Sequence, residues 1–305
     1  MRRHNVKLII NPNADLGKAW RVGSDLRPII DSYGGADWAG TVYPTHAIEL
    51  ARQAGEDGYE LVIAAGGDGT VHEVVNGLMQ VPAEKRPRLG IVPLGSGNDF
   101  AHALGVAKNP SEALRQLLNG KPKRSDVGLL EDNLGRREYW NNTLGIGFDA
   151  TVTIRSHTLP VVRGFMMYLI AVLQTIVLNH EAIAMEVHTD QGDWQEETMM
   201  FVICNGAREG GGFMVAPQAV PDDGLFHYAA ISKVSRAMML RLVPEVMRGT
   251  HGRFKPVRMG HFTRLELKAD RPVYIHIDGE VFADFGSRVQ ALKVEMFPDA
   301  LEVLV

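Results

Sequence analysis

The sequence has little cysteine, no excess of charge of either sign and no long apolar run. Its single cysteine, Cys204, excludes an internal disulfide, and we expect a buried, inert thiol in a reducing, cytoplasmic setting. The 32 basic and 36 acidic side chains give a formal net charge of -4. This balance argues against a nucleic-acid partner, because such a partner requires a broad electropositive face.

Two stretches that resemble targeting or membrane segments are too short for those roles. The opening "MRRHNVKLIINP" has only a short apolar run and no cleavage-site pattern, so we expect a first strand rather than a secretory signal. The apolar stretch at 165–178, "FMMYLIAVLQTIVL", has 14 residues, whereas a membrane span needs about 20. No transmembrane segment is therefore expected. The stretch is either a buried helix or a surface that dips into lipid.

The first third of the chain alternates short apolar runs with amphipathic segments, which predicts an α/β domain with a parallel, Rossmann-like sheet. Helices are expected in "THAIELARQAGEDG", where Thr45 could cap the start, in the segment after Thr70, and in "PSEALRQLLN". The expected strands are 6–11, 38–43, 60–66 and 88–95.

After about residue 125 the pattern changes to period-two runs, which predict a mostly antiparallel β-sandwich with helices near 163–178 and 235–248. A chain of 305 residues is long enough for two cores. We expect domains at 1–126 and 127–295 with a ligand cleft between them. A return of the last segment, about 296–305, to the first domain is left open.

The loop in "AAGGDGTVHEVVNGL" places three glycines where an apolar strand ends and a helix begins. Helix N-termini favour phosphate, glycines permit its close approach, and Thr70 could cap the helix and donate its hydroxyl. Asp68 would repel phosphates unless a cation lies between them, which favours Mg²⁺. A plain glycine-rich turn is the alternative. The residues predicted to bind a nucleotide here are Gly66, Gly67, Asp68, Gly69 and Thr70.

The next strand ends in a similar loop, "VPLGSGNDFAHALG". Loops at the carboxyl ends of adjacent parallel strands line one crevice, so both loops are expected to face one ligand. Asn11, at the end of the first strand, could reach the same crevice. Alternatively, Asn98 and Asp99 only satisfy N–H groups of a capped helix. The predicted binding residues are Gly95, Ser96, Gly97, Asn98 and Asp99.

Two acidic sites lie in the second half. "VAPQAVPDDGLF" is either an Asp-Gly turn or a metal site that uses one carboxylate and neighbouring carbonyls. In "VYIHIDGEVF", strand periodicity places His276 and Asp278 on one face, and Glu280 shares their parity. Paired carboxylates there could accept a hydroxyl proton and hold a cation. A hairpin turn is the alternative.

Taken together and in this order, these loops resemble the diacylglycerol kinase catalytic family, in particular bacterial lipid kinases related to sphingosine and ceramide kinases. The resemblance runs over essentially the whole chain. It rests on "GGDGT" with "VHEVVNGL", on "PLGSGNDFA", on "NNTLGIGFDA", on "NGAREGGGFMVAP" and on "VPDDGLF". Ser96 stands where threonine is commoner and keeps the hydroxyl, while "NPNADLGK" is a looser match to the family's first-strand motif.

The resemblance implies ATP-dependent transfer of the γ-phosphoryl group to a hydroxyl of diacylglycerol or a similar lipid, with Mg²⁺ as cofactor. It adds Thr45 and Glu73 to the nucleotide site. It implies a structural Mg²⁺ bound by backbone oxygens of Val220 and Leu225 and by the Asp223 carboxylate. The catalytic residues it implies are Asp68, Asp278 and Glu280. Either Glu280 or Asp278 would accept the hydroxyl proton, and Glu280 is favoured as the base with Asp278 orienting it.

A lipid substrate also implies peripheral association with a membrane and makes 127–295 the lipid-substrate domain. The stretch 165–178 with "RSHTLPVVRG" could then form an apolar shelf on which Arg155 and Arg163 meet lipid phosphates. "KPKR" at 121–124 is expected to be a solvated loop. A homodimer is left open. The alternative functions are an NAD kinase, which shares "GGDGT", and a lipid-binding protein of the same fold without turnover.

Overall fold

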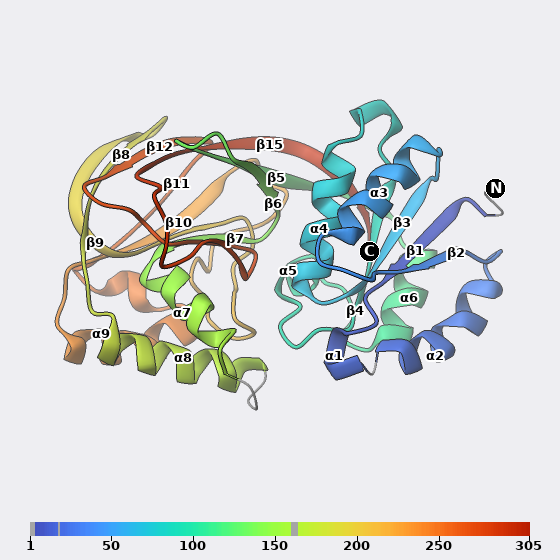
Figure 1. The fold of residues 1–305 in the computed structure, drawn as a ribbon, viewed down its shortest axis with the longest axis horizontal. Helices are drawn as coiled ribbons and strands as arrows, with labels where there is room; N and C mark the ends of the chain where they lie inside the picture. The colour runs from blue at the N-terminus through green and yellow to red at the C-terminus, as the bar shows by residue number, and fades with distance from the viewer. Residues whose placement is uncertain (1–3, 18, 160–163) are drawn as a thin grey trace. The chain divides into compact units, whose positions relative to one another are not determined.

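The computed structural model describes residues 4–17, 19–159 and 164–305 (Figure 1). The chain forms two compact units: residues 1–127 with 298–305, and residues 128–297. Two strands, β5 (Pro122–Asp132) and β15 (Ala291–Leu304), contribute residues to both units. Each unit has its own hydrophobic core, and each is described separately below.

The first unit is a parallel sheet covered by helices on both faces, as the alternating pattern predicts (Figure 1). Both faces of β3 are buried, which explains why its sequence is a continuous apolar run. The strand order in the sheet of this unit is β15-β4-β3-β1-β2. The bounds are β1 Val6–Ile10, β2 Asp37–Gly40, β3 Leu61–Gly66 and β4 Arg88–Pro93. Its helices are α1 Ala14–Gly17, α2 Ala19–Asp31, α3 His46–Glu56, α4 Asp68–Met79, η1 Ala83–Lys85, α5 Asp99–Ala103 and α6 Pro110–Asn119.

Thr45 is the N-cap residue of α3, as predicted, but neither Thr45 nor Thr70 makes the predicted side-chain cap. Thr45 precedes α3 but makes no side-chain cap hydrogen bond, and its backbone is left-handed with φ 71°. The Glu73 carboxylate caps α3 instead, because it accepts the N–H groups of Thr45 at 2.8 Å and Ala47 at 3.0 Å. Thr70 lies inside the first turn of α4, whose N-cap is Gly67. A contact between two helices thus replaces the expected local cap.

The second unit is mostly antiparallel, as its period-two runs predict. Its strands follow the order β14-β13-β7-β9-β8-β12-β15, while β10 pairs with β9 and β11, and β5 pairs with β6 and β15. The bounds are β6 Arg137–Trp140, β7 Thr143–Gly147, β8 Ile183–Thr189, β9 Gly192–Cys204, β10 Phe226–Ser232, β11 Val257–Phe262, β12 Arg264–Ala269, β13 Ile275–Ile277 and β14 Glu280–Ala283.

Helices α8 (Gly164–Leu178) and α9 (Arg236–Met247) confirm the two predicted in this half, although residue 163 lies outside the described residues. A third, α7 (Phe148–Ser156), was not predicted, and η2 (His251–Arg253) is a short turn. Apolar side chains of α7, α8 and α9 pack with one face of β9 and β10 in a single core cluster. Cys204 lies in this cluster, where burial raises the pKa of its thiol, as expected for an inert cysteine.

Helix α8 has a buried face, as expected for a buried helix, and exposed apolar residues at its end. Tyr168, Ala171 and Ile176 are buried, whereas Val177 and Leu178 are exposed by 63% and 62%. At 15 residues, α8 is shorter than a membrane span, and no helix among the described residues is long and apolar enough to cross a bilayer.

Candidate functional site

The two predicted glycine-rich loops of the first unit touch backbone to backbone. A Cβ placed on Gly95 would lie 2.4 Å from the Gly67 Cα, and one on Gly66 would lie 2.2 Å from the Thr70 Oγ1. The Leu94 N–H donates to the Gly66 carbonyl at 2.8 Å. This hydrogen bond extends the β3-β4 pairing by one residue, to the start of the loops. Glycine is therefore required at these positions to bring the loops together at the start of α4.

Asn98 shapes the second loop from within. Its backbone is left-handed with φ 52°, a conformation that asparagine tolerates better than most residues. Its Oδ1 accepts the Gly95 N–H at 3.0 Å, and its Nδ2 donates to the Gly95 carbonyl at 2.7 Å. The side chain thus closes the loop around Gly95, while Ser96 at the tip is exposed.

Two carboxylates meet where the loops touch. The Asp99 N–H donates to the Asp68 Oδ1 at 2.7 Å. A Cβ on Gly97 would lie 2.8 Å from the Asp68 Oδ2 and 3.4 Å from the Asp99 Oδ2, so both carboxylates face this glycine. Burial, followed by the negative charge of Asp99, raises the pKa of Asp68 to about 7. The donor set fits Mg²⁺, because a hard cation takes carboxylate oxygens and would relieve their repulsion.

The other predicted nucleotide residues of this unit surround the first loop. The Asn11 N–H donates to Ala65 at the end of β3, and its Nδ2 lies 3.3 Å from the Thr70 Oγ1. Asn11 is thus held beside the start of α4. Glu73 lies one turn further along α4 and accepts the N–H of Thr45, the residue before α3. Glu73 therefore has a structural task that the sequence did not reveal.

The predicted metal residues of the second unit lie in a turn before β10. Asp223 Oδ1 accepts the Leu225 N–H at 3.0 Å, and Oδ2 lies 3.2 Å from the His227 Nε2. Gly224 has φ 73°, and Val220 is exposed. The Asp-Gly turn is thus present. A carboxylate has about four lone-pair sites, so Asp223 retains capacity for a cation.

Asp278 and Gly279 form the two-residue turn between β13 and β14. Their φ angles of 52° and 85° fit a type I′ hairpin turn, which favours Asp-Gly. The buried Asp278 carboxylate accepts three backbone N–H groups, from Asn141 at 3.0 Å, Asn142 at 2.8 Å and Thr143 at 3.0 Å. It anchors the hairpin to the segment before β7. Glu280, the next residue after the turn, is exposed.

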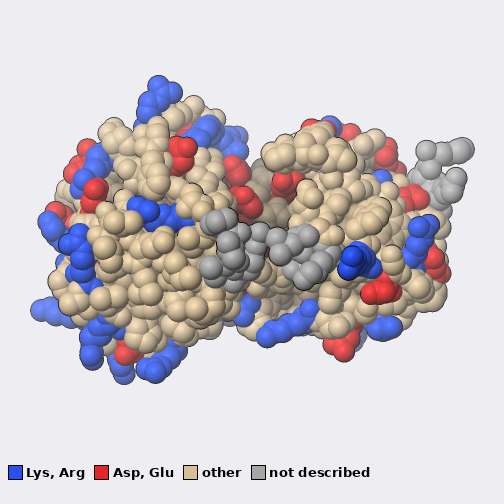
Figure 2. Space-filling view, turned by 60° about the horizontal axis from the view of Figure 1, so that its bottom comes forward, with Lys and Arg blue, Asp and Glu red and all other residues tan. Residues whose placement is uncertain are grey.

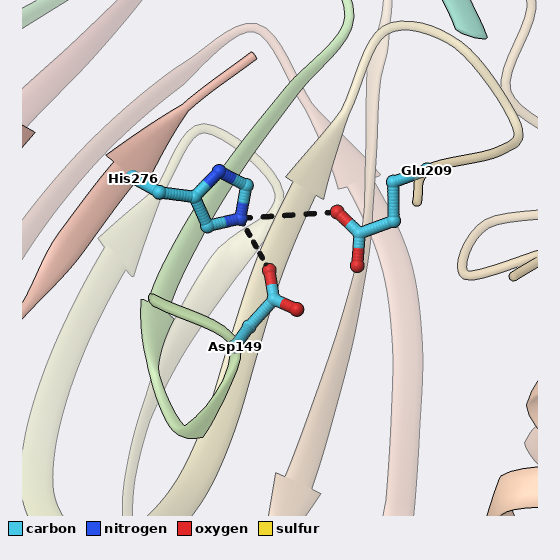
Figure 3. A group of neighbouring side chains, drawn as sticks. All are labelled: Asp149, Glu209 and His276. Atoms are coloured by element: carbon cyan, nitrogen blue, oxygen red, sulfur yellow. Dashed lines mark hydrogen bonds and ion pairs between the residues drawn. The ribbon is translucent and has the colours of Figure 1, made fainter. Parts of the chain in front are cut away.

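A buried cluster beside this turn was missed by the sequence analysis (Figure 3). The His276 Nε2 lies 2.5 Å from the Asp149 Oδ2 and 3.8 Å from the Glu209 Oε2, and all three residues are buried. Gly145 leaves room for this contact, because a Cβ there would lie 2.2 Å from the His276 Nε2. The sequence signals were the shared parity of His276 and Asp278 and the motifs "NNTLGIGFDA" and "NGAREGGGFMVAP", which contain Asp149 and Glu209 but do not show that the three residues meet.

An apolar cavity lies among α7, α8, α9 and the sheet. Its volume is about 40 Å³, and Asp149 and Glu209 are its charged lining residues. Phe148, Val172 and Leu242 are among its apolar lining residues and represent the three helices.

The two predicted phosphate-binding arginines are not both available for that role. The Arg155 guanidinium donates to Asn179 just beyond the end of α8, with Nε at 2.9 Å from Oδ1, so it is already engaged within the unit. Arg163 lies outside the described residues. The structure therefore weakens the case for Arg155 as a lipid-phosphate contact.

Both halves of the chain match known families. Residues 5–130 match the diacylglycerol kinase catalytic domain, and residues 142–305 match the YegS C-terminal NAD kinase beta sandwich-like domain. The first match identifies a kinase-type transferase. The chain belongs to the family of diacylglycerol kinases and YegS-like lipid kinases.

Individual relatives agree with this assignment. A Chromohalobacter salexigens protein named "Probable lipid kinase YegS-like" is 34% identical over 236 residues, covering 76% of this chain and 73% of its own. The Bacillus subtilis diacylglycerol kinase is 30% identical over 239 residues, covering 77% and 75%. A crystal structure of a Bacillus anthracis diacylglycerol kinase shares the fold, with a TM-score of 0.72 at 20% identity over 98% and 96% of the chains.

The NAD kinase alternative has only a distant counterpart. The yeast NADH kinase structure gives a TM-score of 0.52 at 11% identity, over 98% of this chain and 82% of its own. Such a likeness concerns the fold alone. The family matches therefore favour the lipid kinase class.

Proposed function

We propose that the protein transfers the γ-phosphoryl group of ATP to a hydroxyl group of a lipid such as diacylglycerol. The observation that carries this proposal is the Asp68–Asp99 carboxylate pair, set where two glycine loops meet at the N-terminus of α4. The helix N-terminus favours phosphate, and the paired carboxylates favour a divalent cation. Phosphoryl transfer requires mainly positioning and charge neutralisation, which these two features would supply.

The chain's own groups would divide the work as follows. Backbone N–H groups of the glycine loops bind the phosphates, and Asp68 with Asp99 holds the cation. Mg²⁺, when bound, neutralises charge on the transferred phosphoryl group. Glu280 accepts the proton of the acceptor hydroxyl, because it is exposed, whereas the carboxylate of Asp278 is committed to three backbone N–H groups.

The apolar cavity of the second unit supports a lipid acceptor. Most of its lining is aliphatic or aromatic, and it extends among three helices that carry few charges. The free energy of an apolar group falls when it leaves water for such a lining.

The proposed function is tested by offering γ-labelled ATP and Mg²⁺ with mixed micelles of single lipids and, separately, with NAD. Label is expected in a lipid that bears a free hydroxyl, with diacylglycerol tested first. Label in NAD would contradict the proposal, and so would the absence of label in every hydroxyl-bearing lipid. A lipid that binds without becoming labelled would favour the non-catalytic alternative.

We further propose a structural Mg²⁺ at Asp223 with the backbone oxygens of Val220 and Leu225. Removing Mg²⁺ with a chelator is expected to lower the melting temperature, because a ligand that binds only the folded state stabilises it. Thermal unfolding with and without chelator measures the effect in wild type and in Asp223→Asn, which should show a smaller shift. A wild-type melting temperature that is unchanged by the chelator would argue against this site.

The outer face of α8 and α9 would dock on a membrane. No charged residue occurs in α8, and Figure 2 shows a broad uncharged surface on the left half of the view, with Lys and Arg at its edge. Leu240 on α9 is exposed like Val177 and Leu178, and Arg241 lies next to it. Exposed apolar patches with a basic border bind anionic lipid surfaces.

Replacing Val177 and Leu178 together by Asp is therefore expected to reduce binding to vesicles that contain anionic phospholipid by at least about tenfold, because charge replaces inserted apolar surface. Co-sedimentation with vesicles measures this binding. Leu134→Asp, at another exposed leucine of the same unit, is the matched control and should bind like wild type. Equal binding by all three proteins would exclude this face from docking.

A further inference from the structure

We infer that His157, His276 and Asp149 are positioning residues that fix the peptide group between Asp278 and Glu280. The inference rests on the proposed function, in which Glu280 is the base. It concerns residues that contact neither nucleotide nor acceptor in that proposal. They act on Glu280 through the backbone of the turn that precedes it.

Both polar backbone groups of Gly279 are held by histidine side chains. The Gly279 N–H donates to the His276 Nδ1 at 3.4 Å, and the Gly279 carbonyl lies 3.2 Å from the His157 Nε2. His276 belongs to β13 and His157 follows the last residue of α7, so the two contacts come from different elements. They fix the orientation of the turn from two sides.

His276 is itself fixed by the cluster in Figure 3. Since its Nδ1 accepts the Gly279 N–H, its ring proton lies on Nε2, which is 2.5 Å from the Asp149 Oδ2. Asp149 therefore sets the tautomer and the orientation of the imidazole. The chain of contacts runs from Asp149 through His276 to the peptide that leads into Glu280.

Packing alone does not hold this peptide. A Cβ placed on Gly279 would meet no described atom within 4 Å, and its φ of 85° is one that glycine adopts freely. Asp278 fixes the first half of the turn, but the exposed Glu280 side chain follows the unpacked glycine. The two histidine contacts limit rotation of this peptide in addition to the pairing of Glu280 with Ile277, and small displacements of a catalytic group are costly.

The state of the His276 ring tests the inference without any activity measurement. Nitrogen chemical shifts of ¹⁵N-labelled protein at pH 7.5 should show Nδ1 without a proton and Nε2 with one. They should also show a through-hydrogen-bond or proximity signal to the Gly279 amide. Protons on both nitrogens would mean that Nδ1 cannot accept that amide, which would overturn the inference.

His157 gives the functional test, because its side chain is exposed and its replacement should leave folding intact. His157→Leu removes the N–H that reaches the Gly279 carbonyl, whereas His157→Gln keeps a donor at the Nε2 position. We expect His157→Leu to lower kcat about tenfold, as for a misplaced catalytic group, with the KM for ATP unchanged. His157→Gln should recover most of that loss. His188→Leu, at another exposed histidine of this unit, is the matched control and should behave like wild type.

The outcomes distinguish failure of the proposed function from failure of the positioning role. An inactive wild type would reject the proposed function, and the His276 nitrogen shifts would still decide whether the turn is held as inferred. An active wild type with an unchanged kcat in His157→Leu would overturn the inference and leave the proposed function standing. A lower kcat that His157→Gln does not recover would also count against positioning through the Gly279 carbonyl.

Discussion

Replacing Asp68 by Asn is expected to abolish phosphoryl transfer while making the nucleotide-free protein more stable above pH 7. Activity is lost because the cation loses a carboxylate ligand. Stability rises because burial and the charge of Asp99 raise the pKa of Asp68 from 3.8 to about 7. The Asp68 carboxylate also accepts the N–H groups of Asn98 and Phe100, but burial and the Asp99 charge outweigh these bonds, since the net pKa is raised. Asn keeps an oxygen for the Asp99 N–H and carries no charge to repel Asp99.

The pH dependence of this effect has a definite sign. Between 3.8 and about 7 the folded carboxyl keeps its proton while the unfolded one has lost it. The free energy of unfolding of wild type should therefore fall as pH rises through this window and stay low above it. Asp68→Asn should lack this fall. Urea unfolding at pH 4.5, 6 and 8 measures the difference.

Asp132 provides a control, because its pKa is shifted in the opposite direction to that of Asp68. Burial acts to raise the pKa of this carboxyl, but hydrogen bonds from Arg136 and Leu134 outweigh it, so the pKa is lowered. Its contribution to stability is present above the ordinary pKa and is lost as pH falls, so Asp132→Asn should destabilise the protein at pH 8. If Asp68→Asn also lowered stability at pH 8, or retained turnover, the carboxylate-pair account would be wrong.

Glu280→Gln is expected to lower turnover by at least about 100-fold, the usual contribution of a general base. Its melting temperature should match wild type, because the side chain is exposed. Phosphoryl transfer under saturating ATP, together with thermal unfolding, gives both readings. Asp278→Asn is the contrasting variant, because one amide oxygen cannot replace a carboxylate that accepts three N–H groups.

Asp278→Asn should therefore lose stability as well as activity. The two variants together assign the roles of the paired carboxylates. Asp278 would be the base if Glu280→Gln kept its turnover and Asp278→Asn lost turnover while remaining as stable as wild type. Loss of activity in both, with instability in Asp278→Asn alone, is the pattern that the structure favours.

The local features of this protein followed from its sequence. Apolar runs that alternate with amphipathic segments gave the parallel sheet, and period-two runs gave the antiparallel half. Gly66, Gly67 and Gly69 were expected to permit close approach of a phosphate, and Gly67 also lies where its loop touches Gly95 of the second loop. These signals act over a few residues, through strand and helix periodicity and through the conformational range of glycine.

Contacts between distant residues did not follow from the sequence. His276 and Asp149 are 127 positions apart, and Asp99 reaches Asp68 across 31. The cap of α3 was assigned to Thr45, but Glu73 supplies it from another helix. A charged or polar side chain has several chemically suitable partners along a chain, and only packing selects among them. The sequence alone therefore determined the fold class and the loops, while tertiary structure decided which carboxylates, histidines and N–H groups meet.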